Sequence, residues 1–252
     1  WEFQYEKGNF TIPFPSKVKG DDTFTVPLSK FYDVIDTERL LPDDLASYQS
    51  YIEERHRKMI ALTFDDGPDP TTTPQALAIL KKYNAKATFF MVGKNVSANP
   101  DIAKQVRKEG HQIGNHTWDH PQLPKLSLDN AKKEILDTQE AIQKATGVQT
   151  KITRPPYGAI NNAIQYSVDQ SFIMWDVDSL DWKTHNTTAI LNEVKKEVKP
   201  GSIILMHDIH QTTIDALPTV LDYLKSQGYT FVTVDELLDY QLESHRIYYN
   251  GN

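Results

Sequence analysis

The stretch ALTFDDGPDP, residues 61–70, joins an apolar segment typical of a β-strand to two adjacent aspartates, Asp65 and Asp66. Two carboxylates side by side at the end of an apolar strand repel each other, and this repulsion destabilises a fold unless a cation lies nearby. The Gly67-Pro68 pair that follows is typical of a turn. The stretch therefore predicts a strand that ends in a site containing a cation.

From residue 58 onward, apolar strand-like runs alternate with amphipathic helical patterns, several of which end in Gly as helices often do. This alternation predicts a parallel sheet, either open or closed into a barrel. The strand-like runs are MIALTF, ATFFMVG, HQIG, SFIMWDV, GSIILMH and YTFVTV. The helical patterns are TPQALAILKKYN, PDIAKQVRKEG, SLDNAKKEILDTQEAIQKATG, TTAILNEVKKEVKPG and IDALPTVLDYLKSQG.

Unusual polar residues gather just after the strands, in TFDDG, GNHTWDH, TRPPYG, DVDSLDW and LMHDIH. In parallel α/β folds, the carboxyl ends of the strands and the loops after them form the active face. The five clusters therefore predict one functional site on that face.

Composition narrows the class of protein. The chain has 252 residues, a net charge of -7 and no cysteine. The acidic balance argues against a nucleic-acid partner, and the lack of cysteine excludes disulfides, thiolate zinc sites and a cysteine nucleophile. No apolar run approaches the ~18 residues of a membrane span, and a chain that opens on Trp1 indicates a piece of a longer protein.

Residues 1–57 differ from the rest. FTIPFP and FTVPLS suggest short strands interrupted by prolines, and a helix is expected from Pro42 onward. We interpret residues 1–57 as the tail of a preceding extracellular domain plus a connector. The alternative is that residues 1–57 are an N-terminal addition to the main domain. The main domain covers residues 58–240, and a tail follows at 241–252.

His116 and His120 are the first candidates for metal ligands. Their i, i+4 spacing predicts a helical turn with both imidazoles on one side. Two imidazoles and one carboxylate, from Asp65 or Asp66, form a common ligand set for a zinc-type ion. The other aspartate can act as general base on a water whose pKa the ion lowers. The alternatives are that His116 hydrogen-bonds a loop, that His120 is only exposed, and that one aspartate caps the next turn.

Hydrolysis also requires an acid for the leaving group. His207, at the end of the GSIILM strand, is the candidate, and Asp181 could pair with it and raise its pKa. A purely structural role for His207 is the alternative.

The motifs TFDDG, HTWDH, RPPYG, DSLDW and LMH occur in this order over residues 58 to about 240. Together they resemble the polysaccharide deacetylases of carbohydrate esterase family 4, which contain a NodB homology domain. The resemblance implies an α/β fold, a deformed (β/α) barrel with fewer than eight repeats, here preceded by a short fragment of another domain.

The resemblance also implies roles for individual residues. Asp65 matches the general base and His207 the general acid, while Asp66, His116 and His120 match the metal ligands. The supporting residues match as follows: Arg154 orients the base, Asp181 partners the catalytic histidine, the Tyr157 backbone N–H donates to the oxyanion, and Trp182 and Leu205 line the acetyl pocket.

The expected activity is metal-dependent N-deacetylation of N-acetylmuramic acid or N-acetylglucosamine in peptidoglycan, with chitin oligomers as possible substrates. The resemblance leans slightly to the muramic-acid type. It implies one divalent ion, Zn²⁺ first, with Co²⁺, Mn²⁺ and Ni²⁺ as alternatives. It further implies an extracellular, cell-wall enzyme of a Gram-positive bacterium, monomeric, with the full-length protein anchored in the membrane.

Two other classes of protein compete with this interpretation. One is a metal hydrolase that acts on a phosphoester or a cyclic amide, although such sites often need further cationic groups or a second metal. The other is a glycan-binding module without catalytic activity. Within the deacetylase interpretation, the alternative is an enzyme specific for another polysaccharide such as chitin. The presence of both Asp65 and His207 argues against a binding module.

Overall fold

The computed structural model describes residues 4–6, 9–13, 23–27 and 58–251, and the chain divides into two units, Trp1–Glu53 and Glu54–Asn252. In the first unit, β1 (Gln4–Glu6), β2 (Asn9–Pro13) and β3 (Thr23–Pro27) form an antiparallel sheet. The two proline-containing strands expected there are therefore present. The helix expected from Pro42 onward lies outside the described residues.

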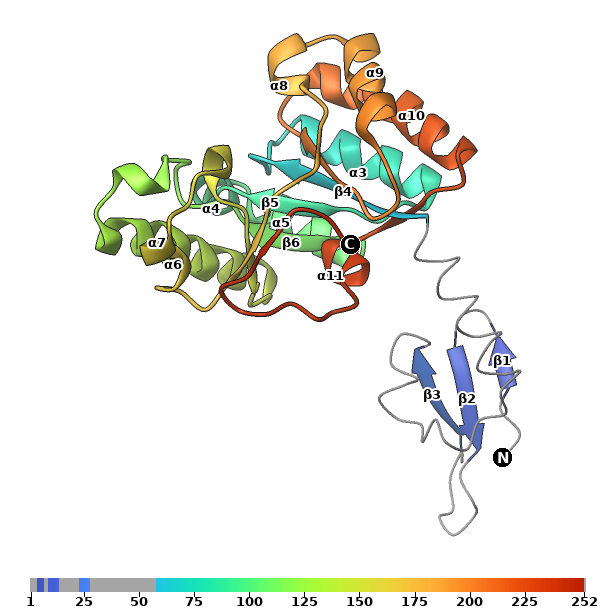
Figure 1. The fold of residues 1–252 in the computed structure, drawn as a ribbon, viewed down its shortest axis with the longest axis horizontal. Coiled ribbons are helices and arrows are strands. Elements are labelled where there is room, and N and C mark those ends of the chain that lie inside the picture. The colour runs from blue at the N-terminus through green and yellow to red at the C-terminus, as the bar shows by residue number, and fades with distance from the viewer. Residues whose placement is uncertain (1–3, 7–8, 14–22, 28–57, 252) are drawn as a thin grey trace. The chain divides into compact units, whose positions relative to one another are not determined.

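The second unit is built on a curled, entirely parallel sheet of nine strands, in which β4 lies centrally beside β5 and β10 (Figure 1). The strand order is β12-β8-β7-β6-β5-β4-β10-β9, and β11 pairs with the start of β4. This arrangement confirms the expected deformed (β/α) barrel. Its strands are β4 (Met59–Asp65), β5 (Thr88–Met91), β6 (Gln112–Asn115), β7 (Ile152–Thr153), β8 (Ser171–Ile173), β9 (Val177–Asp178), β10 (Ile203–His207), β11 (Thr230–Val232) and β12 (Ile247–Tyr248).

Helices surround the sheet in two groups, one formed by α3, α9 and α10 and the other by α4 to α7 (Figure 1). None of the helices in the described part of the chain combines the length and apolar character that a membrane span requires. The helices are α3 (Thr72–Tyr83), α4 (Gly93–Ala98), α5 (Pro100–Lys108), α6 (Leu128–Thr146), α7 (Asn162–Gln165), α8 (Asp181–Thr184), α9 (Thr187–Glu197), α10 (Gln211–Ser226) and α11 (Val234–Leu237), with the 3₁₀ turns η3 (Leu123–Lys125) and η4 (Pro156–Gly158).

The alternation of side chains along β4 decides where the polar residues point. Ile60, Leu62 and Phe64 pack into the large cluster between the sheet and the helices, whereas Met59 and Ala61 pack into the barrel interior. Because successive strand residues face opposite sides, Asp65 shares the interior face. The strand therefore carries a carboxylate at the carboxyl end of the barrel's inner surface.

Sequence analysis missed the shortest elements. Strands β7, β9 and β12 have two residues each, too few to show an alternating pattern. The terminal residues 241–252, interpreted as a tail, contribute β12, which pairs with β8. Gly93 was assigned to the end of a strand but begins α4. The strand pairing shows that residues near the C-terminus help to close the sheet.

We expect Gly114→Ala to lower the free energy of unfolding by about 1–3 kcal/mol, because the new methyl group overpacks the interior. A Cβ at Gly114 would lie 2.4 Å from Cδ1 of Phe90, a buried ring that stacks on the Arg154 guanidinium. Chemical denaturation measures the loss. The double variant Gly114→Ala/Phe90→Leu provides the control, since the smaller side chain at residue 90 removes the clash. Its loss of unfolding free energy should therefore be smaller than the sum of the losses in the two single variants. A loss equal to that sum would contradict the packing argument.

Candidate active site

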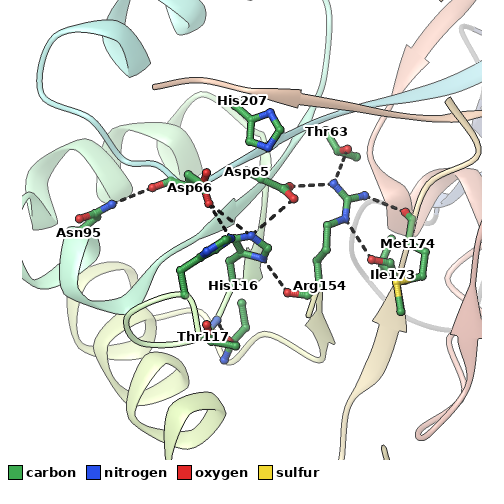
Figure 2. A network of polar contacts seen from close by, with 12 residues as sticks. Thr63, Asp65, Asp66, Asn95, His116, Thr117, Arg154, Ile173, Met174 and His207 are labelled. Atoms are coloured by element: carbon green, nitrogen blue, oxygen red, sulfur yellow. Dashed lines mark hydrogen bonds and ion pairs between the residues drawn. The ribbon is translucent and has the colours of Figure 1, made fainter. Parts of the chain in front are cut away.

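The carboxyl ends of β4, β6, β7 and β10 bring the expected site residues together (Figure 2). Asp65 and His207 end neighbouring strands and are paired in register. His116 follows β6 and Arg154 follows β7, which pairs with β6. Figure 2 shows Asp65 between Asp66 on one side and Arg154 on the other.

Arg154 is fully buried and uses its guanidinium to hold Asp65. Its Nη1 donates to Asp65 Oδ1 at 2.8 Å and to Thr63 Oγ1 at 2.7 Å. Its Nε and Nη2 donate to the carbonyls of Ile173 and Met174 at 3.0 and 2.9 Å. A buried charge is tolerated only when it is paired and hydrogen-bonded, so these contacts fix the orientation of Asp65 as well as its charge balance.

Asp66, His116 and His120 form a candidate metal centre. Asp66 Oδ1 lies 3.4 Å from Nε2 of His116 and 3.3 Å from Nε2 of His120. Ligands placed tetrahedrally about 2.1 Å from a zinc-type ion lie about 3.4 Å apart. The three atoms, which all lie within 4.8 Å of one another, therefore fit a single ion.

The hydrogen bonds of the trio support this fit. His116 Nδ1 lies 2.6 Å from the Arg154 carbonyl, which can only accept, so Nδ1 carries a proton and Nε2 is the nitrogen that faces Asp66. Asp66 Oδ1 is buried and has no hydrogen-bond partner. A cation between this carboxylate oxygen and the two imidazole nitrogens would satisfy all three, and these donor atoms are the types that zinc binds.

The protonation states of Asp66 and His120 also suit metal binding, which requires deprotonated ligands. Burial would raise the pKa of Asp66, but the adjacent His116 and His120 outweigh it and lower that pKa to about 2. Burial, together with the neighbouring His116, lowers the pKa of His120 below its ordinary value. At neutral pH the trio therefore contains an ionised carboxylate beside a neutral His120.

The helical turn expected for the two histidines is wrong. The segment from His116 to His120 is a loop after β6, and its backbone has positive φ at Thr117 (65°) and at His120 (66°). The imidazole centroids still lie 4.9 Å apart, because the loop folds back on itself. The i, i+4 spacing thus singled out two histidines whose side chains lie together, although the helical geometry it predicted is wrong.

His207 and Asp181 form the second polar pair of the site. Asp181 Oδ1 lies 2.8 Å from His207 Nδ1, and Asp181 Oδ2 accepts from the His207 backbone N–H and from Thr213 Oγ1, each at 2.7 Å. Burial alone would lower the pKa of His207, but the hydrogen bond and charge of Asp181 raise it to about 9. His207 is therefore a cation at neutral pH, with Nε2 available beside Asp65 (Figure 2).

The three expected substrate-binding residues lie around this centre in different environments. Tyr157, with φ 61°, is largely exposed, and its ring lies 4.8 Å from that of His120. Trp182 is also exposed, and its backbone N–H donates to Asp181 Oδ1 at 2.8 Å. Leu205 is buried in β10, two residues before His207.

Two cavities, of about 490 and 580 Å³, open elsewhere around His111, and no expected site residue lines them. They lie at the opposite ends of the strands, next to the start of β6.

Several residues that position the site were missed by sequence analysis. Thr63 precedes the double aspartate by two residues, and strand alternation could have placed it on the same face as Asp65. Thr213 and Glu134, which contact Asp181 and the histidine loop, lie on helices and give no local signal. Asp208 is fully buried against Gly67, and burial raises its pKa to about 7.

Comparison with known proteins gives one consistent result. Residues 52–171 match the profile described as polysaccharide deacetylase, and residues 1–49 match that of the peptidoglycan GlcNAc deacetylase N-terminal domain. Peptidoglycan-N-acetylglucosamine deacetylase PgdA of Listeria monocytogenes is 41% identical over 98% of this chain and 53% of its own length. A peptidoglycan-N-acetylglucosamine deacetylase of Bacillus cereus is 42% identical over 77% of this chain and 94% of its own.

The third relative has a solved structure. Peptidoglycan-N-acetylmuramic acid deacetylase PdaC of Bacillus subtilis is 44% identical over 72% of this chain and 39% of its own length. Its structure superposes with a TM-score of 0.70 over 71% of this chain and 89% of the solved chain. The chain thus spans about half the length of PgdA and less than half that of PdaC.

We expect Asp66→Asn to abolish tight binding of Zn²⁺, because an amide cannot supply the anionic ligand. Asp65→Asn should retain the ion, since Asp65 lies outside the trio and its amide oxygen can still accept from Arg154. Competition with a chromophoric chelator measures the affinity. Thermal melting provides a second readout, because an ion at 100 times its Kd stabilises the protein by about 2.7 kcal/mol. Equal loss of the ion in both variants would contradict the assignment of the trio.

Proposed function

This chain belongs to the polysaccharide deacetylase family, and we propose that it removes N-acetyl groups from amino sugars of peptidoglycan by hydrolysis and releases acetate. The observation that carries the proposal is the separation of the two adjacent aspartates. Asp66 faces both histidines, whereas Asp65 is held by Arg154 beside that trio, with His207 across from it (Figure 2). The site thus offers a metal centre, a base and an acid as separate groups.

Asp66, His116 and His120 would hold one divalent ion, with Zn²⁺ the first candidate from the ligand types. When bound, such an ion supplies a Lewis acid that polarises the amide oxygen and lowers the pKa of water. Asp65 acts as general base and takes the proton of the attacking water. Arg154 keeps the Asp65 carboxylate oriented, and Asp65 Oδ2 lies only 3.7 Å from His116 Nε2, at the edge of the metal centre.

His207 acts as general acid. Its Nδ1 is occupied by Asp181, so the proton on Nε2 is the one that can pass to the departing amine. Asp181 keeps the imidazole protonated at neutral pH through the raised pKa of about 9. The amide C–N bond breaks as the nitrogen takes this proton, which leaves a free amino sugar.

The remaining expected residues serve the substrate. We assign the Tyr157 backbone N–H to the developing oxyanion, a contact typically worth about 3 kcal/mol in enzymes with an oxyanion hole. Trp182 and Leu205 would line the pocket for the acetyl methyl group. The exposed Tyr157 and Trp182 rings offer apolar faces on which sugar rings can pack.

The names of the relatives support peptidoglycan as the substrate, and both of its amino sugars occur among them. The match of residues 1–49 favours N-acetylglucosamine over the muramic acid toward which the resemblance leans. We place the activity outside the cell, at the wall of a Gram-positive bacterium. We further propose that the full-length protein is anchored in the membrane, that the catalytic domain is monomeric, and that chitin oligomers are also substrates.

The Zn²⁺-loaded protein, incubated with purified peptidoglycan, should remove one acetyl mass from muramidase fragments. Mass spectrometry of the fragments identifies the sugar that loses it. Asp65→Asn should lower the rate by about 10²–10⁴-fold, the usual contribution of a general base. An intact acetyl mass on both sugars with metal bound would contradict the proposed substrate, and an active Asp65→Asn variant would contradict the proposed base.

The rate should also depend on the pH through His207. The acid must be protonated, and its pKa is raised, so kcat/KM should fall as the pH rises through about 9. In Asp181→Asn the largest contribution that raises this pKa is lost while burial still lowers it, so the fall should move to a lower pH. Asp169→Asn, which changes an exposed carboxylate outside the site, should leave the profile unchanged. An unshifted profile in Asp181→Asn would exclude His207 as the acid.

A further inference from the structure

The loop from His116 to His120 supplies two of the three proposed metal ligands, yet it belongs to no helix or strand. Its Thr117 has φ 65°, a left-handed conformation that is unfavourable for a β-branched residue. Such strain persists only where the surrounding structure imposes it. The contacts that hold this loop therefore decide where the two imidazoles lie.

The N–H groups of the loop are held by two side chains. Asn115 Oδ1 accepts from the Thr117 N–H at 2.9 Å. A single carboxylate oxygen, Oε2 of Glu134 on α6, accepts from the N–H groups of both Trp118 (2.8 Å) and Asp119 (3.1 Å). Glu134 thus fixes two of the four peptide groups that separate the two histidines.

The carbonyls of the same loop are held from the opposite side. At the start of α4, the Gly93 N–H donates to the Thr117 carbonyl at 2.9 Å, and the Lys94 N–H donates to the Trp118 carbonyl at 3.0 Å. The approach is close: a Cβ on Gly93 would lie 2.6 Å from Trp118 Cε3. The loop is therefore hydrogen-bonded to both α4 and α6. Among the groups that bind its N–H and carbonyl groups from Thr117 to Asp119, the carboxylate of Glu134 is the one that is charged.

We propose that Glu134 is a positioning residue of the metal centre, which sets the directions of His116 and His120 by binding the N–H groups of Trp118 and Asp119 between them. This inference rests on the proposed function, because it requires that the trio bind a metal ion. Glu134 does not touch the ion or the substrate. Its effect passes through the backbone, since a shift of Trp118 or Asp119 would move Nε2 of His120 away from Asp66.

Glu134 is a better test of this role than its neighbours. Asn115 is fully buried, and its Nδ2 also donates to the Ile135 carbonyl at 2.7 Å, so its loss would disturb the core. Glu134 is only partly buried at the edge of α6. The same helix carries Glu140, which is exposed and faces solvent, as a matched control for helix propensity and charge.

The experiment compares Zn²⁺ affinity and the visible spectrum of the Co²⁺-loaded form in the full chain. Glu134→Ala should weaken metal binding by about 10- to 100-fold, as the loss of an outer-shell partner typically does. Glu134→Gln, whose amide oxygen can accept both N–H groups, should restore affinity to within a few-fold of wild type. Glu140→Ala should match wild type, and only Glu134→Ala should alter the Co²⁺ absorption bands that report ligand geometry.

Wild-type affinity and an unchanged Co²⁺ spectrum in Glu134→Ala would overturn the proposal. So would a lower Tm of the metal-free protein without any change in metal binding, which would show a structural role only. If Glu134→Ala fails to fold, Glu134→Asp, which withdraws the carboxylate by one methylene, replaces it with the same expectation of weaker binding. Absence of metal binding by the wild-type chain would instead contradict the proposed function, so the two failures can be distinguished.

Discussion

The buried pairing of Arg154 with Asp65 is the interaction on which the rest of the site depends. A guanidinium removed from water loses several kcal/mol of hydration, which only excellent geometry offsets. Here the geometry is supplied by Thr63 and by the carbonyls of Ile173 and Met174 at the end of β8, while the backbone of Arg154 bonds to Asn115 and to His116. One residue therefore connects β4, β6, β7 and β8, and it orients both the proposed base, Asp65, and a proposed metal ligand, His116.

The same geometry explains why two adjacent acids can differ in role. Strand alternation directs Asp65 into the barrel, toward Arg154. Asp66 lies just past the strand with φ 74°, and its carbonyl accepts from Asn95 at 2.7 Å. This turn directs its carboxylate toward the histidines. Aspartate tolerates positive φ better than most residues, so the change in direction costs little.

The sequence predicted the features that repeat or that chemistry requires. The alternation of strands and helices predicted the barrel, and polar clusters after strands predicted the face on which the site lies. Prediction from the sequence failed where the backbone conformation depends on contacts with residues far away in the chain. The His116–His120 spacing suggested a helix, but Glu134 and α4 impose a loop; β12 joins the sheet although its two residues show no pattern. Tertiary contacts of this kind leave no local trace in the chain.

The balance of charge identifies the cation that the double aspartate requires. Among the carboxylates of the site that the structure describes, Asp65 is paired with Arg154, and Asp181 is paired with His207, which its partner keeps protonated. Asp66 faces two imidazoles instead of an arginine: the lowered pKa of His120 leaves that ring neutral at pH 7, and the Nδ1–H of His116 hydrogen-bonds to a carbonyl. Arg154 therefore neutralises the charge of the first aspartate, Asp65. Oδ1 of the second aspartate, Asp66, is buried without a hydrogen bond and lies between two imidazole nitrogens. A divalent cation at that point would satisfy all three atoms at once.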